Sequence, residues 1–162
     1  MKLKPYFSSP GAIALRLDEA GADGLVLFNR FIYLDIDLER LAVRPVVDLS
    51  SPAEARVART WIALLRGKVR ASLAATTGVE VPADLARYLL AGADVVMTTS
   101  ALLGHGPEYA TVLLDGLSSW MRHKGFQTAG ELRGKLSAPD TTDRAGYVAA
   151  MRAANAGGYA PW

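Results

Sequence analysis

Apolar residues recur along the chain with two different spacings, which predict helices and strands in alternation. Helical spacing begins after Pro10 and stops at Gly21, and residues 24–28 then form a short, wholly apolar run. Such runs are typical of strands that are buried on both faces of a parallel sheet. The same reasoning predicts strands over 69–74 and 94–98, and helices over 52–65, 82–90 and from residue 107 onward.

This order of elements predicts an α/β fold, because strands that alternate with helices form a parallel sheet with right-handed crossovers. A short repeat agrees with it: Ala-Gly-Ala-Asp stands at 20–23 and again at 91–94. Each copy suits a glycine that ends a helix, a tight turn and a buried strand. Since many βα proteins reuse such a turn, the repeat supports the fold class and nothing more specific.

Residues 29–51 separate one predicted strand from the next helix, and a connection of this length usually has structure of its own. Apolar and acidic residues alternate within it, which predicts a β-ribbon. The alternating residues are Ile32, Leu34, Ile36 and Leu38 with Asp35, Asp37 and Glu39. A metal site on the three acidic residues is the alternative to carboxylates on the water-facing side of the ribbon.

Composition narrows the classes of protein that fit. The chain has 162 residues, is 51% hydrophobic and carries a net charge of +2, which suits one domain with a real core. The absence of cysteine excludes disulfides, thiolate metal sites and thiol nucleophiles. Basic residues are spread along the chain, so we expect no nucleic-acid partner. The apolar runs are too short for a membrane span and no secretory signal is evident, so we expect a cytoplasmic protein.

Candidate chemistry gathers where the predicted strands end. In α/β sheets and barrels, ligands bind at the carboxyl ends of the strands. Two of these ends offer hydroxyl and backbone N–H groups that are able to hold a phosphate: Thr76, Thr77, Gly78, Thr98, Thr99 and Ser100. The alternative is that these residues only cap the helices that follow.

Two other polar residues lie close to the predicted strand ends. His105 is a possible general base, but a surface histidine is the favoured interpretation. Arg30 is expected to meet an acidic ligand or to pair with Asp35 or Asp37. No G-x-S-x-G motif is present, which gives a serine hydrolase little support.

The spacing of several motifs resembles the carboxyl-terminal half of class 1 dihydroorotate dehydrogenases, and most closely a dihydroorotate dehydrogenase-like branch of that family. The family pattern is Gly-Gly-Ile, four residues, Asp, then Leu-Leu-x-Gly-Ala and Gly-Thr-Ala-Leu. Here Thr77-Gly78-Val79, Asp84, the Leu-Leu-Ala-Gly-Ala run at 89–93 and the Thr-Thr-Ser-Ala-Leu run at 98–102 match it without gaps. Upstream, Lys-Leu-Lys-Pro at 2–5 and Gly-Leu-Val-Leu-Phe-Asn at 24–29 resemble two more strand ends of the family.

The resemblance implies half of an FMN-binding (βα)8 barrel with about four parallel strands. By this resemblance Lys2 faces the flavin ring, and Asn29 holds a pyrimidine substrate. The residues implied to hold the FMN phosphate are Thr77, Gly78, Thr99 and Ser100. Thr77 and Thr99 replace glycines of the family pattern. No catalytic residue is identified, because the family's Cys or Ser base belongs to strands that precede this segment.

A complete barrel usually needs about 250 residues, so we expect a half-barrel domain over 1–125 and a helical tail over 126–162. Four open strands would expose Leu25, Leu27, Val95 and Met97 to water. A homodimer that covers this face is the expected solution, and a separate chain with the missing half is the other. An oxidoreductase would then work only in the completed barrel. The alternatives are a dimer that binds phosphate ligands without redox chemistry, and a promiscuous hydrolase at a dimer cleft.

Overall fold

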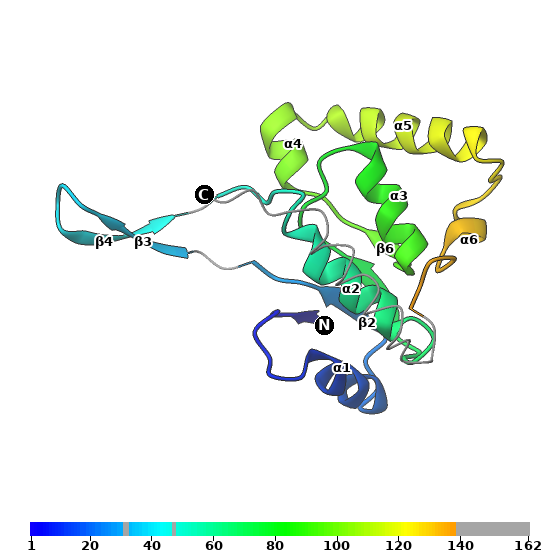
Figure 1. Ribbon diagram of the computed structural model, residues 1–162, viewed down its shortest axis with the longest axis horizontal. Coiled ribbons are helices and arrows are strands. Elements are labelled where there is room, and N and C mark those ends of the chain that lie inside the picture. Colours follow the sequence, from blue (N-terminus) through cyan, green and yellow to red (C-terminus); the bar gives the residue numbers. More distant parts are fainter. Residues whose placement is uncertain (31–32, 47, 139–162) are drawn as a thin grey trace, which may run out of the picture.

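The predicted parallel sheet is present, and it organises the whole domain. The computed structural model describes residues 1–30, 33–46 and 48–138. Its main sheet has four parallel strands in the order β1-β2-β5-β6 (Figure 1). The strands are β1 (Lys2–Leu3), β2 (Gly24–Leu27), β5 (Ser72–Ala75) and β6 (Val95–Val96). The α/β fold class is thereby confirmed, although β5 begins three residues later than predicted and β6 is shorter.

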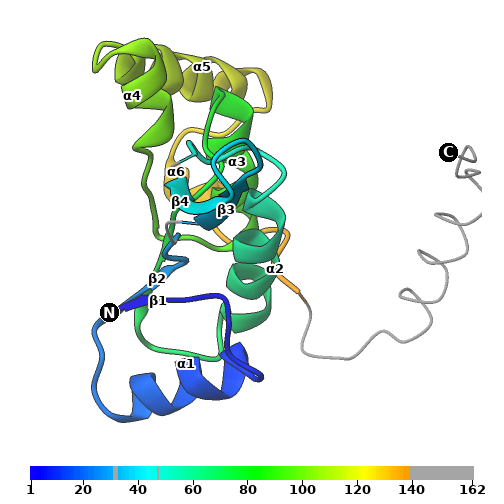
Figure 2. The ribbon, with the colours of Figure 1, turned by 90° about the vertical axis from the view of Figure 1, so that its left-hand side faces the viewer.

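Helices follow the strands as the alternating pattern requires. They are α1 (Pro10–Glu19), α2 (Ala55–Leu65), α3 (Pro82–Ala91), α4 (Ser100–His105), α5 (Tyr109–His123) and α6 (Ala129–Leu132). α2 contacts β2 and β5, α3 contacts β6, and α1 and α5 pack on the outer sides of α2 and α3. Figure 2 shows α2 and α3 on the same side of the sheet. One face of the sheet is therefore covered by helices.

The core lies between that face and the helices. Leu25, Leu27 and Leu73 point toward the helices and are at most 1% exposed. The opposite face carries the row Val26, Ala74 and Val95, which the register places side by side.

The expectation that Leu25 and Leu27 meet water is wrong, whereas Val95 and Met97 are 52% and 43% exposed. Side chains of a strand alternate between faces, and a wholly apolar run does not reveal which alternate residues face the helices. The open face of the sheet therefore carries the second set of side chains, with Val26 in the place where Leu25 and Leu27 had been expected.

The start of α2 differs from the prediction by one turn. A helix was expected directly after Ser51, but residues 52–54 form a turn and α2 begins at Ala55. The Glu54 carboxylate reaches back and accepts a hydrogen bond from the Ser51 N–H at 2.7 Å. This is half of a capping box, so the motif is present but closes a turn that precedes the helix.

The segment from residue 100 to residue 123 forms two helices where one was predicted. α4 ends at Gly106, whose φ of 90° breaks the helix before Pro107. In α5, Leu113 is 2% exposed, whereas its neighbour Val112 is 52% exposed. Neighbouring residues of a helix point about 100° apart, and of these two Leu113 lies on the side of α5 that meets the core.

Both copies of the Ala-Gly-Ala-Asp repeat form the turn that was expected. Gly21 and Gly92 end α1 and α3 with φ angles of 90° and 120°, which are favourable for glycine. The second copy also makes contacts with other elements: the Asp94 carboxylate accepts a hydrogen bond from the Leu73 N–H at 2.9 Å and forms an ion pair with Arg66 at 2.9 Å. Burial alone would raise the pKa of Asp94, but these contacts hold the pKa below its ordinary value.

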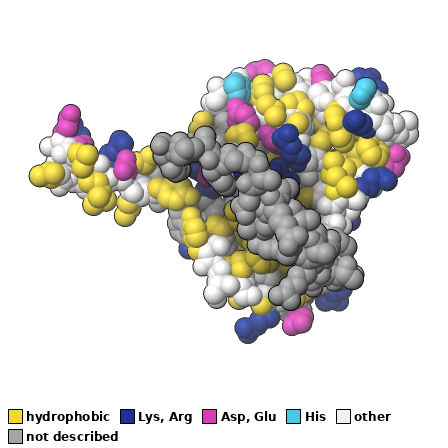
Figure 3. All heavy atoms as spheres, viewed as in Figure 1, with side chains coloured by type: hydrophobic (Ala, Val, Ile, Leu, Met, Phe, Trp, Pro, Cys, Tyr) yellow, Lys and Arg dark blue, Asp and Glu magenta, His cyan; other side chains and the backbone are white. Residues whose placement is uncertain are grey.

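The predicted ribbon is also confirmed, as the hairpin β3 (Tyr33–Asp37) and β4 (Ala42–Val46) that projects from the body (Figures 1 and 3). Its two faces differ. Ile36 pairs with Val43 on one face, where they are 64% and 66% exposed, and Asp35 pairs with Arg44 on the other at 3.3 Å. Figure 3 shows hydrophobic side chains along one side of the hairpin.

Asp35 and Asp37 make their contacts within the hairpin. The Asp37 carboxylate accepts hydrogen bonds from the N–H groups of Glu39 and Arg40, both at 3.0 Å. Within the described ranges, no three His, Asp or Glu side chains stand close enough to hold a metal ion. The contacts of Asp35 and Asp37 therefore follow the ribbon interpretation of this motif.

The chain returns to the body after α5. Leu132 of α6 is fully buried, and the Gly134 N–H donates to the Leu89 carbonyl oxygen at 2.9 Å. The helix expected near residues 143–154 lies outside the described residues, and the domain boundary at residue 125 stays a prediction. In the part of the chain that the structure describes, no helix is both long and apolar enough to cross a membrane.

Candidate functional site

The carboxyl ends of the four strands lie side by side along one edge of the sheet. Backbone hydrogen bonds continue past the strands and tie these ends together. The Asn29 N–H donates to Leu3 at 2.7 Å, the Thr76 N–H to Leu27 at 2.9 Å and the Met97 N–H to Ala75 at 2.8 Å. Polar residues that follow different strands in the sequence are thereby brought to one place.

A polar pocket of about 170 Å³ opens at this edge, and we call it the strand-end pocket. The structure brings most of the predicted site residues together in its wall: Lys2, Asn29, Thr77, Thr99 and Ser100. Further lining residues are Phe28, Arg30, Ser50, Thr76, Val79, Met97 and Thr98. Gly78, the remaining predicted residue, lies directly behind the wall, where its N–H donates to the Ser50 hydroxyl at 3.0 Å.

The loop between β5 and α3 has the backbone of a glycine pair. Thr77 and Gly78 have φ angles of 83° and 68°, in the left-handed region that glycine adopts without cost. A Cβ on Gly78 would lie 2.5 Å from the Ser51 carbonyl oxygen, so no side chain fits there. Thr77, which stands where the family pattern has glycine, thus adopts a backbone conformation that favours glycine.

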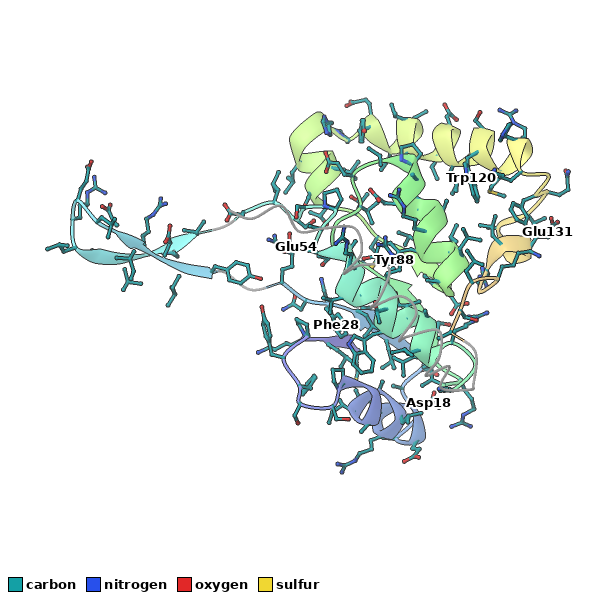
Figure 4. All side chains as sticks on the ribbon, viewed as in Figure 1. Asp18, Phe28, Glu54, Tyr88, Trp120 and Glu131 are labelled. Atoms are coloured by element: carbon teal, nitrogen blue, oxygen red, sulfur yellow. The ribbon has the colours of Figure 1, made fainter. Side chains whose placement is uncertain are left out.

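Buried contacts hold Thr77 in this conformation. The Tyr88 hydroxyl donates to the Thr77 carbonyl oxygen at 2.8 Å, and the Thr77 hydroxyl donates to the Phe28 carbonyl oxygen at 3.2 Å. Figure 4 labels Tyr88 on α3 and Phe28 at the end of β2, the two elements that these hydrogen bonds join to the loop. Burial raises the pKa of Tyr88 above its ordinary value, so its hydroxyl keeps its proton and donates at neutral pH.

Ser50 is the site residue that the sequence reasoning missed. Its hydroxyl lies 2.9 Å from the Ser100 hydroxyl, and its N–H donates to that same Ser100 oxygen at 2.9 Å. Two groups that were predicted to hold a phosphate, the Gly78 N–H and the Ser100 hydroxyl, are thus in contact with Ser50. No motif marks Ser50, because it ends the 29–51 connection and only the fold shows that this connection crosses back over the strand ends.

The strand-end pocket carries positive charge, since Lys2 and Arg30 line it and no acidic side chain does. Arg30 is neutralised by Glu54 at 2.9 Å and also donates to the Asp48 carbonyl oxygen, so the expected partners Asp35 and Asp37 are wrong. Burial alone would raise the pKa of Glu54, but the Ser51 N–H and Arg30 lower it. Among the described residues no carboxylate lies within ion-pair distance of Lys2, which leaves its charge available to an anion.

An apolar pocket of about 340 Å³ adjoins the strand-end pocket. The two share Phe28, Asn29, Arg30 and Thr77 in their walls. The remaining wall of the second pocket is largely apolar and comes from Pro5, Tyr6, Tyr33, Glu54, Val57 and Ala58. Side by side, the two pockets suit a ligand with one anionic end and a flat apolar part.

His105 lies apart from both pockets. Its Nε2 atom is 2.8 Å from a Glu80 carboxylate oxygen, and its ring packs on Tyr109 with ring centres 4.4 Å apart. The favoured interpretation of His105 as a surface histidine is confirmed, since its side chain is 47% exposed, but its acidic partner was not predicted. Glu80 is 25 residues away and reaches His105 only because the loop after β5 and the end of α4 meet in the fold. The pair orients a histidine but does not line the strand-end pocket.

Comparisons with known proteins were made for the whole chain. No family model matches it. It is 29% identical over 141 residues to the catalytic subunit of dihydroorotate dehydrogenase B (NAD(+)) from Trichlorobacter lovleyi, which covers 84% of this chain and 45% of that protein. It is 31% identical over 129 residues to dihydroorotate dehydrogenase A (fumarate) from Lactiplantibacillus plantarum, covering 78% of this chain and 42% of that protein.

Solved structures agree on the fold. The structure of DHODH from Eimeria tenella in complex with ferulenol superposes with a TM-score of 0.69 and 21% identity, over 85% of this chain and 38% of that one. The ligand-free form of the same enzyme gives a TM-score of 0.67. The chain thus spans less than half the length of the relatives that it matches. The resemblance stated from the motifs is confirmed: this chain is similar to a half-length segment of the barrel of class 1 dihydroorotate dehydrogenases.

Proposed function

We propose that this chain provides the FMN-phosphate-binding part of a dihydroorotate dehydrogenase-like oxidoreductase, which is competent for redox chemistry only when the barrel is complete. The observation that carries the proposal is the strand-end pocket. It brings Lys2, Asn29 and the Thr77-Gly78 loop together at the edge where barrel enzymes bind their ligands. The similarity to dihydroorotate dehydrogenases supports the reaction class.

The residues present fit FMN in three respects. The Thr77-Gly78 loop turns sharply at the end of β5, with φ angles of 83° and 68°, and brings Thr77 into the wall of the strand-end pocket. The strand-end pocket is positive and lined by hydroxyls, as a phosphate requires. The adjoining apolar pocket supplies a wall for a flat ring. FMN, when bound, supplies the hydride-accepting chemistry of the reaction.

The chain's own residues would bind the cofactor and orient the substrate. We assign the FMN phosphate to the Thr77-Gly78 loop together with Thr99 and Ser100, and we assign Lys2 to the flavin ring, where its positive charge would stabilise a negatively charged ring. Asn29 stands at the border of both pockets, where its amide is able to donate to and accept from a pyrimidine substrate. A completed barrel would cover the pocket and exclude water from it.

FMN titration of the purified protein tests this proposal. Binding is expected to quench flavin fluorescence, and Lys2→Met is expected to weaken it by about tenfold, the effect of losing one charged contact. Lys68→Met is the matched control, because Lys68 is exposed in the turn before β5, whereas the pocket lies after the other end of that strand. A colourless protein that leaves FMN fluorescence unchanged contradicts the proposal.

A second function is favoured by one observation, the size of the strand-end pocket. At about 170 Å³ it is smaller than the roughly 300–1,000 Å³ of pockets for drug-sized ligands. A phosphate or a small phosphorylated ligand would fill it without the adjoining pocket. The non-redox alternative therefore predicts that inorganic phosphate binds while FMN does not. The same titration with both probes separates the two functions.

We further propose that a second copy of the chain covers the open face of the sheet. Val95 and Met97 expose apolar surface there, and within the described residues β1 and β6 each pair along one side only. Two copies related by a two-fold axis would pair these edges and bury this face. Light scattering after size-exclusion chromatography is expected to give twice the chain mass, and Val95→Asp is expected to give the monomer. A wild-type monomer contradicts this part of the proposal.

A further inference from the structure

The strand-end pocket contains a hydrogen-bonded group that competes with an anion for the same donors. The Ser50 hydroxyl accepts from the Gly78 N–H at 3.0 Å and lies 2.9 Å from the Ser100 hydroxyl. Both of these partners belong to the set that would hold a phosphate. Ser50 and Ser100 line the pocket directly, so an anion in the pocket meets this group first.

The donors can be counted. A hydroxyl gives one hydrogen and accepts two. Whichever serine donates in the Ser50–Ser100 hydrogen bond, one hydrogen is used and one remains for a ligand, and the Gly78 N–H is already bonded. Without the Ser50 hydroxyl, the Gly78 N–H and the Ser100 O–H would both be open to a ligand. The native arrangement therefore offers an anion one donor fewer than the same pocket without Ser50.

Ser50 is held firmly in this position. Its own N–H donates to the Ser100 hydroxyl oxygen at 2.9 Å. The carbonyl oxygen of the next residue, Ser51, packs so closely on Gly78 that no side chain fits there. The backbone thus fixes the Ser50 side chain over the Gly78 N–H. A ligand that uses this N–H must displace the hydroxyl.

We propose that Ser50 is an intramolecular competitor for the phosphate site and sets its affinity for anions. The inference rests on the proposed function, because it concerns the same phosphate site. It goes beyond that function by naming the residue that regulates binding there. Removal of the hydroxyl is expected to strengthen binding of a phosphate group, whereas loss of a residue that binds the ligand would weaken it.

The test compares Ser50→Ala with Ser50→Thr, which keeps the hydroxyl, in titrations with inorganic phosphate and with FMN in a phosphate-free buffer. Ser50→Ala is expected to lower Kd for both probes by about tenfold, the effect of one additional charge-assisted hydrogen bond. Ser50→Thr is expected to keep the wild-type Kd. Ser51→Ala is the matched control, because its hydroxyl contacts Glu54 at 3.3 Å and does not line the pocket.

The outcomes separate this inference from the proposed function. If the wild type binds FMN and Ser50→Ala binds it equally or more weakly, the competitor role is overturned and the proposed function stands. If the wild type binds only inorganic phosphate and Ser50→Ala binds it equally or more weakly, the competitor role is overturned and the non-redox function takes the place of the proposed one. If neither protein binds either probe, both are overturned. Binding by Ser50→Ala alone supports the competitor role most directly. Circular dichroism of each variant confirms that the fold is kept before its titration is interpreted.

Discussion

The Tyr88 hydroxyl donates a 2.8 Å hydrogen bond to the Thr77 carbonyl oxygen and so joins the middle of α3 to the loop at the strand-end pocket. Tyr88 is fully buried. Thr77 has a φ of 83°, which costs a non-glycine residue of order 1–3 kcal/mol. The hydrogen bond helps to hold that conformation, so a core residue determines the shape of the candidate site.

Tyr88→Phe tests this relationship. The variant keeps the ring in the core but leaves the Thr77 carbonyl oxygen without its donor, so we expect the free energy of unfolding to fall by about 1–3 kcal/mol. Urea denaturation measures it. Tyr109→Phe is the matched control, because Tyr109 is half-buried and packs its ring on His105. Equal stability of the two variants would show that the Tyr88 hydroxyl does not support the loop.

Gly78→Ala and Gly21→Ala separate crowding from backbone strain. Both glycines have positive φ angles, of 68° and 90°, so alanine costs about 1 kcal/mol at each. An added Cβ at Gly78 would lie 2.5 Å from the Ser51 carbonyl oxygen, whereas nothing lies within 4 Å at Gly21. We expect Gly78→Ala to lose at least about 2 kcal/mol more than Gly21→Ala in thermal or urea unfolding. Similar losses would contradict the tight packing over the loop.

Acid is expected to weaken the fold through Asp94. The contacts with Leu73 and Arg66 lower the pKa of this carboxyl in the folded state. A lowered folded-state pKa stabilises the protein above the unfolded pKa of about 3.9, and this stability is lost as the pH falls through the folded value. Asp94→Asn should therefore lose about 1–3 kcal/mol at pH 7 and show a flatter fall in stability below about pH 4.

The repeat provides the control for Asp94. Asp23 stands at the same position of the first Ala-Gly-Ala-Asp copy but is exposed. Asp23→Asn is expected to follow the wild-type curve of unfolding free energy against pH. If Asp94→Asn follows that curve as well, the contacts of Asp94 carry no stability.

The hairpin is expected to tolerate polar substitutions on its apolar face. Ile36 is 64% exposed, so Ile36→Thr removes little buried surface and keeps a β-branched residue in the strand. We expect a change in the free energy of unfolding within about 0.5 kcal/mol. Leu25→Ala, at a fully buried position, should cost about 2–5 kcal/mol. A large loss with Ile36→Thr would mean that the hairpin packs on the body in solution.

Much of the fold could be predicted because its signals are local. Prolines at helix starts, glycines at helix ends and apolar runs between them placed the elements to within a few residues, and spacing alone related 77–102 to a known pattern. Which side chains of a strand point toward the helices could not be predicted in the same way. The run at 24–28 is apolar throughout, so nothing in it distinguishes Leu25, which is buried by helices, from Val26 on the open face.

The lining of the strand-end pocket could be predicted for residues that directly follow strands, and it was missed for residues that do not. Asn29, Thr77 and Thr99 stand directly after apolar runs, and parallel strands bring such positions together. Ser50 and Glu54 arrive from a long connection whose path depends on the whole fold. Their partners Ser100 and Arg30 lie 50 and 24 residues away. Contacts of this kind leave no periodic pattern in the sequence.

The sheet has one face covered by helices and one open face, and substitutions on the two faces are expected to have different effects. A substitution at Leu73 alters the domain's own folding, because Leu73 is 1% exposed beneath the helices. A substitution at Val95, on the open face and 52% exposed, removes little buried surface and is expected to alter that folding much less. The two faces can therefore diverge independently, and the open face can acquire a new partner while the strand-end pocket is preserved.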